Sequence, residues 1–189
     1  MRPHKIVIIG SSAGGPRILR ELFTGIPFLD GSIVIVQHMP KFVNESLRDH
    51  LNNCTDMMVS VAQDGDRLEK GRVYVAPSEV HLELVNNQRI RLFNGEKVNF
   101  ARPSVDVTMK SLKNEPRFAL IGIILTGMGR DGAEGISHIK NIGGITIAQN
   151  EMTCAVYGMP KKAIETGNID WVLKPDRIKD KLVELMGVI

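Results

Sequence analysis

Short apolar runs that alternate with helix-like patterns are the feature that most constrains the fold of this chain. The first run, Ile6–Ile9, ends at a glycine and predicts a buried strand. A helix is expected from Pro16 to Thr24, because proline suits a first helical turn. Ser32–Gln37 is rich in β-branched residues and predicts a second buried strand, and helical spacing follows at Val43–Leu51. This β-α-β-α opening predicts parallel strands joined by right-handed crossovers.

The middle of the chain has a different pattern. Three short strands are expected there, at Arg72–Ala76, His81–Val85 and Arg89–Phe93. The second and third flank Asn86-Asn87-Gln88, a sequence suited to a hairpin turn. We therefore expect this section to form an antiparallel appendage on the sheet.

The remaining third returns to the alternating pattern. Pro103 precedes a helix that Ser104 is expected to cap and that continues to about Leu112, and the apolar run Phe118–Leu125 predicts a central strand. The later elements are a helix at 131–141, strands at 145–148 and 171–173, and an amphipathic helix at 175–186. The predicted fold class is α/β: a doubly wound, mostly parallel sheet flanked by helices, with a small antiparallel hairpin section in the middle of the chain.

Size and composition narrow the function classes. With 189 residues, 43% of them hydrophobic, the chain is expected to form a single domain over residues 1–189. The net charge is only +3 and the basic residues are spread out, which argues against a nucleic-acid partner. The longest apolar stretch is far shorter than the roughly 20 residues of a membrane helix, so no membrane insertion is expected. Residues 1–9 do not resemble a signal peptide, and two cysteines suggest no disulfide framework, so we expect a cytoplasmic protein.

The first predicted strand ends in the turn Gly10-Ser11-Ser12-Ala13-Gly14-Gly15, which fits the pattern Gly-x-Ser-x-Gly. Small residues on each side of Ser12 allow a sharp strand-to-helix turn that leaves the hydroxyl exposed. Ser11 occupies an x position of that pattern, so Ser12 is the better candidate nucleophile. The pattern alone is weak, because a phosphate-binding or merely structural turn has the same glycines.

Two other predicted strand ends carry complementary groups. His38 follows the second strand, and Asp131 follows the strand at 118–125. Because sites in an open parallel sheet form outside the carboxyl ends of the strands, His38 could reach Ser12 as a general base and Asp131 could orient the imidazole ring. The alternatives are a structural histidine and an aspartate that caps a helix.

The chain order and the residue types separate this pattern from two common families. A dinucleotide-binding turn would have glycine where Ser12 stands and an acidic residue at the end of the second strand, where this chain has Gln37-His38. The order Ser12, His38, Asp131 differs from the Ser, Asp, His order of α/β-hydrolases. If these residues form a triad, it belongs to another lineage.

Nearly the whole chain resembles the catalytic domain of the CheB chemotaxis protein-glutamate methylesterases. The resemblance rests on short segments in a fixed order, namely Ile9–Gly15, Gln37–Pro40, Val75–Pro77 with His81-Leu82, Arg102–Asp106, Leu125–Ala133, Ala148–Glu151 and Tyr157–Pro160. It implies a serine hydrolase that demethylates γ-glutamyl methyl esters on methyl-accepting chemoreceptors, releasing methanol, and that deamidates certain receptor glutamines in the adaptation step of chemotaxis.

The resemblance also assigns roles. It implies a catalytic triad of Ser12, His38 and Asp131. The oxyanion and substrate-binding candidates are Ala13 and Met128, each through a backbone N–H, and three residues of one segment, Arg102, Ser104 and Asp106. For Ser104 the start of a helix is the alternative role. No cofactor and no metal are expected, since the five histidines show no metal-ligand spacing.

Two departures from the family pattern stand out. The family's turn often has threonine after the catalytic serine, where this chain has Ala13. CheB proteins also usually carry an N-terminal receiver domain, whereas this chain is expected to contain none, so it is either a stand-alone esterase or part of a longer parent chain. Two other functions stay open: an esterase or amidase with a different substrate, and a non-catalytic domain that binds a nucleotide or a partner.

Overall fold

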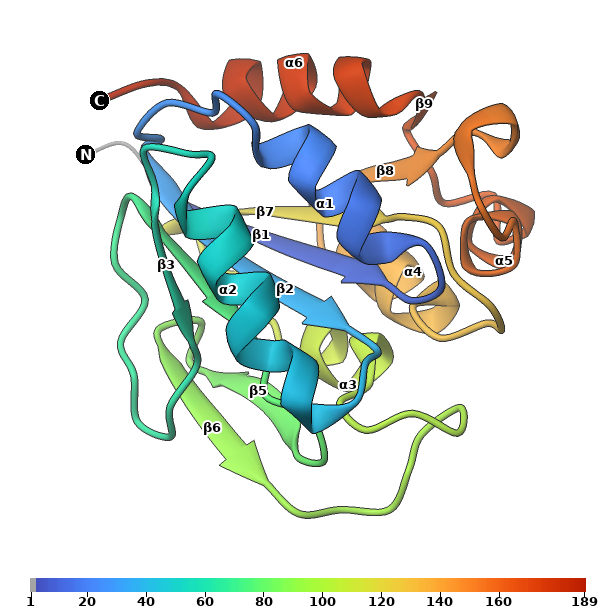
Figure 1. Cartoon of the computed structure of the whole chain (residues 1–189), viewed down its shortest axis with the longest axis horizontal. Coiled ribbons are helices and arrows are strands. Elements are labelled where there is room, and N and C mark those ends of the chain that lie inside the picture. Colours follow the sequence, from blue (N-terminus) through green and yellow to red (C-terminus); the bar gives the residue numbers. More distant parts are fainter. Residues whose placement is uncertain (1–2) are drawn as a thin grey trace.

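The computed structural model describes residues 3–189; Met1 and Arg2, where the segment assessed as a signal peptide begins, lie outside the described residues. Its centre is a seven-stranded sheet in the order β3-β4-β2-β1-β7-β8-β9, in which every neighbouring pair is parallel (Figure 1). The strands are β1 (His4–Ser11), β2 (Gly31–Gln37), β3 (Met58–Val61), β4 (Arg72–Val75), β7 (Phe118–Ile124), β8 (Ile145–Gln149) and β9 (Trp171–Leu173).

Helices cover both faces of this sheet. They are α1 (Gly15–Phe23), α2 (Asn44–Asn52), α3 (Val105–Lys110), α4 (Ala133–Asn141), α5 (Met159–Glu165) and α6 (Pro175–Met186), with short 3-10 turns η1 (Lys41–Val43) and η2 (Glu151–Thr153). One buried cluster joins α1, α2 and α6 to one face, and a second joins α3, α4 and α5 to the other. In β1, Val7 and Ile9 belong to the first cluster while Ile6 and Ile8 belong to the second, as expected for a strand buried on both sides.

The middle section departs from the prediction in one respect. β5 (His81–Val85) and β6 (Arg89–Phe93) form the predicted antiparallel hairpin, as a separate two-stranded sheet. The preceding segment was expected in the same antiparallel appendage, but β4 lies inside the main sheet, parallel to both β2 and β3. The run Arg-Val-Tyr-Val is buried at its last three positions, and a strand buried on both faces fits a parallel sheet.

The order of the strands determines where a site can form. β2 and β4 lie on one side of β1, while β7, β8 and β9 lie on the other, so the winding direction reverses between β1 and β7. In doubly wound sheets this switch point leaves a crevice at the carboxyl ends of the strands. The Ser12 turn and the loop after β7 both begin at this crevice. Within residues 3–189, no helix is long and apolar enough to span a membrane.

Candidate active site

Backbone hydrogen bonds join three neighbouring strand ends at the switch point. The Ser12 N–H donates to the carbonyl oxygen of Thr126, just beyond β7, at 3.0 Å. The His38 N–H, just beyond β2, donates to the carbonyl oxygen of Ser11 at 3.0 Å. Gly127 approaches so closely that a Cβ there would lie 2.8 Å from the Ser12 Cβ. The three loops therefore form one connected surface around Ser12.

Gln37 fixes the serine-containing turn from the side. The Ser11 hydroxyl, fully buried, donates to Gln37 Oε1 at 2.6 Å, and Gln37 Nε2 donates to the carbonyl oxygens of Ser12 and His38 at 2.8 Å each. A Cβ at Gly15 would lie only 1.9 Å from Gln37 Oε1, so this position requires glycine. Ser11 is thus engaged and inaccessible, whereas Ser12 is half-buried. This difference favours Ser12 as the reactive hydroxyl.

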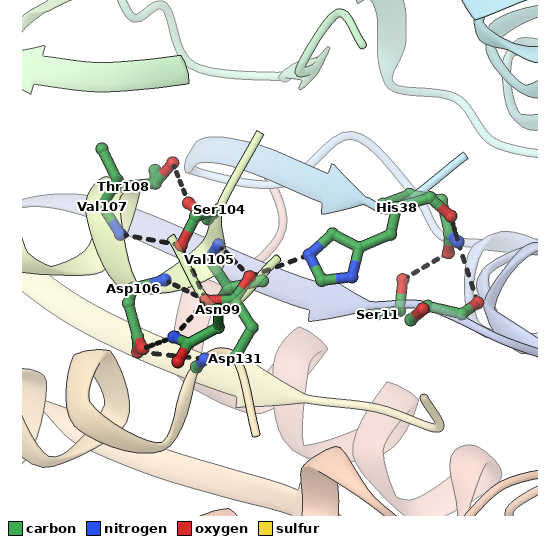
Figure 2. Close-up of polar contacts among 12 residues, drawn as sticks. Ser11, His38, Asn99, Ser104, Val105, Asp106, Val107, Thr108 and Asp131 are labelled. Carbon is green, nitrogen blue, oxygen red and sulfur yellow. Dashed lines mark hydrogen bonds and ion pairs between the residues drawn. The ribbon is translucent and has the colours of Figure 1, made fainter. Parts of the chain in front are cut away.

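The structure brings His38 and Asp131 together. His38 Nε2 lies 2.8 Å from Asp131 Oδ2, with 19% of the histidine side chain exposed and only 2% of the aspartate side chain (Figure 2). An ionised carboxylate can only accept hydrogen bonds, so Nε2 carries the proton in this pair. The other ring nitrogen, Nδ1, then keeps its lone pair and can accept a proton. In Figure 2 the imidazole ring lies between Asp131 and Ser11 at the end of β1.

No hydrogen bond joins the Ser12 hydroxyl to His38 within residues 3–189. The predicted three-residue chain is therefore formed in its His38–Asp131 half only. Nucleophile–base contacts are often long before substrate binds and shorten in the reacting complex, so this geometry is compatible with proton transfer from Ser12.

Asp131 accepts hydrogen bonds from several directions. Its donors are Ser104 Oγ at 2.7 Å, Val105 N–H at 2.7 Å, His38 Nε2 at 2.8 Å, Asp106 N–H at 3.1 Å and Asn99 Nδ2 at 3.4 Å. Burial alone would raise the pKa of Asp131, but the hydrogen bonds from His38, Ser104 and the two backbone N–H groups lower it below the ordinary aspartate value. Asp131 therefore stays ionised and holds a negative charge beside the imidazole ring.

Ser104 and Asp106 lie elsewhere than the substrate-groove prediction requires. Ser104 is fully buried, and its hydroxyl donates to Asp131 while accepting from the Val107 N–H at 3.4 Å, which makes it the N-cap of α3. Asp106 is 2% exposed, and its carboxylate faces the backbone of α4 rather than a groove. Both side chains support Asp131 from behind, so the helix-start interpretation of Ser104 holds. Asp131 itself lies two residues before α4, which begins at Ala133 rather than at 131 as predicted.

Arg102 and Met128 line an open pocket beside the pair. The pocket has a volume of about 500 Å³ and includes His38, Asp131 and the exposed ring of Phe100 in its wall. Arg102 Nη1 donates to the Gly95 carbonyl oxygen at 2.7 Å, while its buried Nε has no partner within residues 3–189. A cavity of about 570 Å³ along α4 and α5 contains none of the triad candidates, so the smaller pocket is the one that matches the chemistry.

Two backbone N–H groups near Ser12 are available to a ligand. Those of Ala13 and Met128 donate to no acceptor within residues 3–189. The two loops are tied together, because Thr126 Oγ1 donates to the Ala13 carbonyl oxygen at 3.0 Å. Free N–H groups on loops held in this way are suited to stabilise a developing oxyanion. Among residues 3–189, no group of three His, Cys, Asp or Glu side chains is arranged to hold a metal ion.

Sequence reasoning missed two supporting residues. Gln37 stands next to His38 in the segment Gln-His-Met-Pro, and its position at a buried strand end was the available signal. Asn99 contacts Asp131 and Asp106 from a loop without periodicity, and no sequence pattern marked it.

The comparisons with known proteins agree with this geometry. The family model described as CheB methylesterase matches residues 7–182. A protein-glutamate methylesterase/protein-glutamine glutaminase of Haloarcula marismortui is 44% identical, over 94% of this chain and 50% of that protein, and one of Thermotoga maritima is 41% identical, over 96% and 54%. The chain thus spans about half the length of the curated relatives it matches. The crystal structure of the Thermotoga maritima CheB methylesterase catalytic domain superposes with a TM-score of 0.90 at 41% identity, covering 97% of this chain and 99% of that one. This chain therefore belongs to the CheB methylesterase family.

Proposed function

We propose that this chain is a serine hydrolase that demethylates γ-glutamyl methyl esters on methyl-accepting chemoreceptors and deamidates receptor glutamines. The observation that carries the proposal is the 2.8 Å contact between His38 Nε2 and buried Asp131, on the sheet edge that also carries the Ser12 turn. The names of the relatives, protein-glutamate methylesterase/protein-glutamine glutaminase, support the choice of both substrates.

The proposed reaction is a two-step acyl transfer. His38 Nδ1 takes the Ser12 proton as the serine oxygen attacks the glutamyl ester carbon, and Asp131 stabilises the imidazolium that forms. The imidazolium then gives its proton to the departing methoxide, so methanol leaves and an acyl-enzyme remains. Water, deprotonated by His38, hydrolyses the acyl-enzyme to glutamate and restores Ser12. A glutamine substrate follows the same steps with ammonia as the leaving group.

The pocket residues supply the remaining roles in this proposal. The N–H groups of Ala13 and Met128 stabilise the oxyanion, and each such donor typically lowers the barrier by about 2.7–4 kcal/mol. Arg102, whose side chain lines the pocket, contacts the substrate at the pocket wall. No cofactor takes part in these steps.

The setting of the enzyme is part of the proposal. We place it in the cytoplasm as one domain over residues 1–189, with the chemoreceptor as its protein partner and no nucleic-acid partner. The free thiols of Cys54 and Cys154 fit a reducing compartment. Because the relatives are about twice as long as the matched region, a receiver domain in a longer parent chain is compatible with this proposal.

The test measures methanol release from methylated receptor membranes. Wild type is expected to release methanol, and Ser12→Ala is expected to lose activity by several orders of magnitude. Ser46→Ala, the same change on the exposed face of α2, is the matched control and should keep the wild-type rate.

Three outcomes would contradict the proposal. Equal rates for wild type and Ser12→Ala would remove Ser12 as the nucleophile. Hydrolysis of simple esters without any release from receptors would favour an esterase or amidase with another substrate. Tight nucleotide binding with no hydrolysis of either kind would favour a binding domain.

A further inference from the structure

A second buried carboxylate, Asp106, lies close to Asp131 and takes no part in the reaction described above. Its Oδ1 accepts from the backbone N–H groups of Gly132 at 3.0 Å and Gly135 at 2.6 Å, at the start of α4. Its Oδ2 accepts from Asn99 Nδ2 at 2.7 Å. Gly132 is the residue that follows Asp131, so Asp106 fixes the backbone that carries Asp131.

The two carboxylates cap each other's helices. Asp131 accepts from the N–H groups of Val105 and Asp106, in the first turn of α3, while Asp106 accepts from those of Gly132 and Gly135 around the start of α4. The N-cap of α4 is a glycine, which has no side chain to cap its own helix, so Asp106 supplies that function from α3. Moving either carboxylate therefore displaces the other.

Asn99 joins the pair on the side of the active-site pocket. Its Nδ2 carries two hydrogens and lies within hydrogen-bond distance of Asp106 Oδ2 and Asp131 Oδ1. The residue has a φ of 50°, a left-handed conformation that asparagine tolerates better than most residues. Asn99 also lines the pocket, so it connects the buried pair to the surface where the substrate would bind.

We propose that Asp106 is a positioning residue for the hydrolysis, acting through Asp131: with Asn99 it fixes the carboxylate that faces His38, and its negative charge adds to the potential that stabilises the His38 imidazolium. The proposal rests on the role given to His38 and Asp131 in the proposed function. Burial raises the pKa of Asp106, the Gly135 N–H lowers it and the nearby Asp131 charge raises it, so the pKa lies above the ordinary aspartate value. The hydrogen bonds that its carboxylate accepts all come from N–H donors, which fits the ionised form.

The charged groups around the pair define what else could act on His38. Lys110 and Glu134 lie near Asp106 on α3 and α4, and they form an ion pair with each other at the surface. Lys97 and Arg102 line the same pocket as His38. These four groups are unchanged in the variants below, so their effect on the His38 ring is the same in every variant.

The experiment follows the titration of the His38 ring by NMR in the intact chain, with the His38 signal identified by its absence in His38→Gln. Asp106→Asn removes one negative charge and is expected to move the midpoint of the His38 titration to lower pH by about half a unit. Asn99→Ala removes the donor that helps to hold both carboxylates in place, and is expected to move the midpoint in the same direction by a smaller amount. Ile139→Val, a buried change on α4, is the control for reduced stability and should not move it.

Activity supplies a second readout. The acid limb of the pH profile of kcat/KM, measured on methylated receptor membranes, should move with the NMR midpoint in both variants. A His38 midpoint that stays in place in Asp106→Asn and Asn99→Ala would overturn the proposal, whatever the activity. If Asp106→Asn does not fold, the direction in which Asn99→Ala moves the His38 midpoint tests the proposal alone. The NMR titration needs no substrate. Failure of the proposed function would therefore be recognised separately, because the wild-type protein would then release no methanol from receptor membranes.

Discussion

Replacing Ser104 by alanine separates a supporting role from a substrate-binding role. The Ser104 hydroxyl donates to Asp131 Oδ1 at 2.7 Å and accepts from the Val107 N–H as the N-cap of α3. Loss of a serine N-cap typically costs about 1 kcal/mol. Loss of a hydrogen bond to a charged group costs about 1.5–3 kcal/mol, and the lower end applies because Asp131 Oδ1 keeps other donors. The free energy of unfolding should therefore fall by about 2.5 kcal/mol.

The assay for this prediction combines urea and thermal unfolding with methanol release. A loss of that size should lower the Tm by about 5–10 °C for a chain of this length. The kcat should fall less than tenfold, because Val105 and His38 still bind Asp131 Oδ2, and KM should not change. Ser46→Ala on the surface of α2 serves as the control for the serine-to-alanine change. Wild-type stability together with a raised KM would refute this reasoning and return Ser104 to the substrate groove.

Three further changes probe other parts of the site. Gly15→Ala places a Cβ 1.9 Å from Gln37 Oε1, so we expect the loss of the contacts that fix the serine turn, with a lower Tm by calorimetry and reduced methanol release. Met128→Pro removes a backbone N–H and should lower kcat by about 10²–10³-fold relative to Met128→Ala, which keeps it, and equal rates in the two variants would argue against that donor. The lowered pKa of Asp131 means that it contributes stability above the unfolded aspartate pKa of about 3.9, and that this contribution is lost as pH falls through the native pKa. Asp131→Asn, already less stable at neutral pH, should therefore lose less further stability than wild type in unfolding measurements between about pH 5 and pH 2, and parallel curves would contradict the assignment.

Periodicity and composition predicted the strands that are buried on both faces. The continuous apolar runs in β1, β2 and β7 are best buried as central strands of a parallel sheet. The order of these strands in the sheet then determines where the crevice lies. The same reasoning missed β3 and α5. β3 is a four-residue edge strand with an exposed first residue, and α5 has seven residues and no side-chain cap at its glycine N-cap, so each carries too little local signal.

The part of the candidate site that lies at the strand ends could be predicted from the sequence. Ser12, His38 and Asp131 each follow a predicted buried strand, and parallel strands bring their carboxyl ends to one edge. The support behind Asp131 could not be predicted in this way. Ser104 and Asp106 reach it only because α3 packs against α4 on one face of the sheet, and that contact depends on the tertiary fold rather than on any local pattern.

The position of Asp131 links the chemistry to the stability of the fold. Asp131 is the proposed partner of His38, and it also caps α3 through the N–H groups of Val105 and Asp106. Its carboxylate therefore cannot move without disturbing a helix start, which holds it in place for His38 before any substrate arrives. His38 differs, because within residues 3–189 its ring makes one side-chain hydrogen bond, at Nε2, and its Nδ1 is left without one. The fold thus fixes the Asp131 end of the proposed triad, and in the proposed reaction the Ser12–His38 contact, which is open in this structure, forms when the substrate binds.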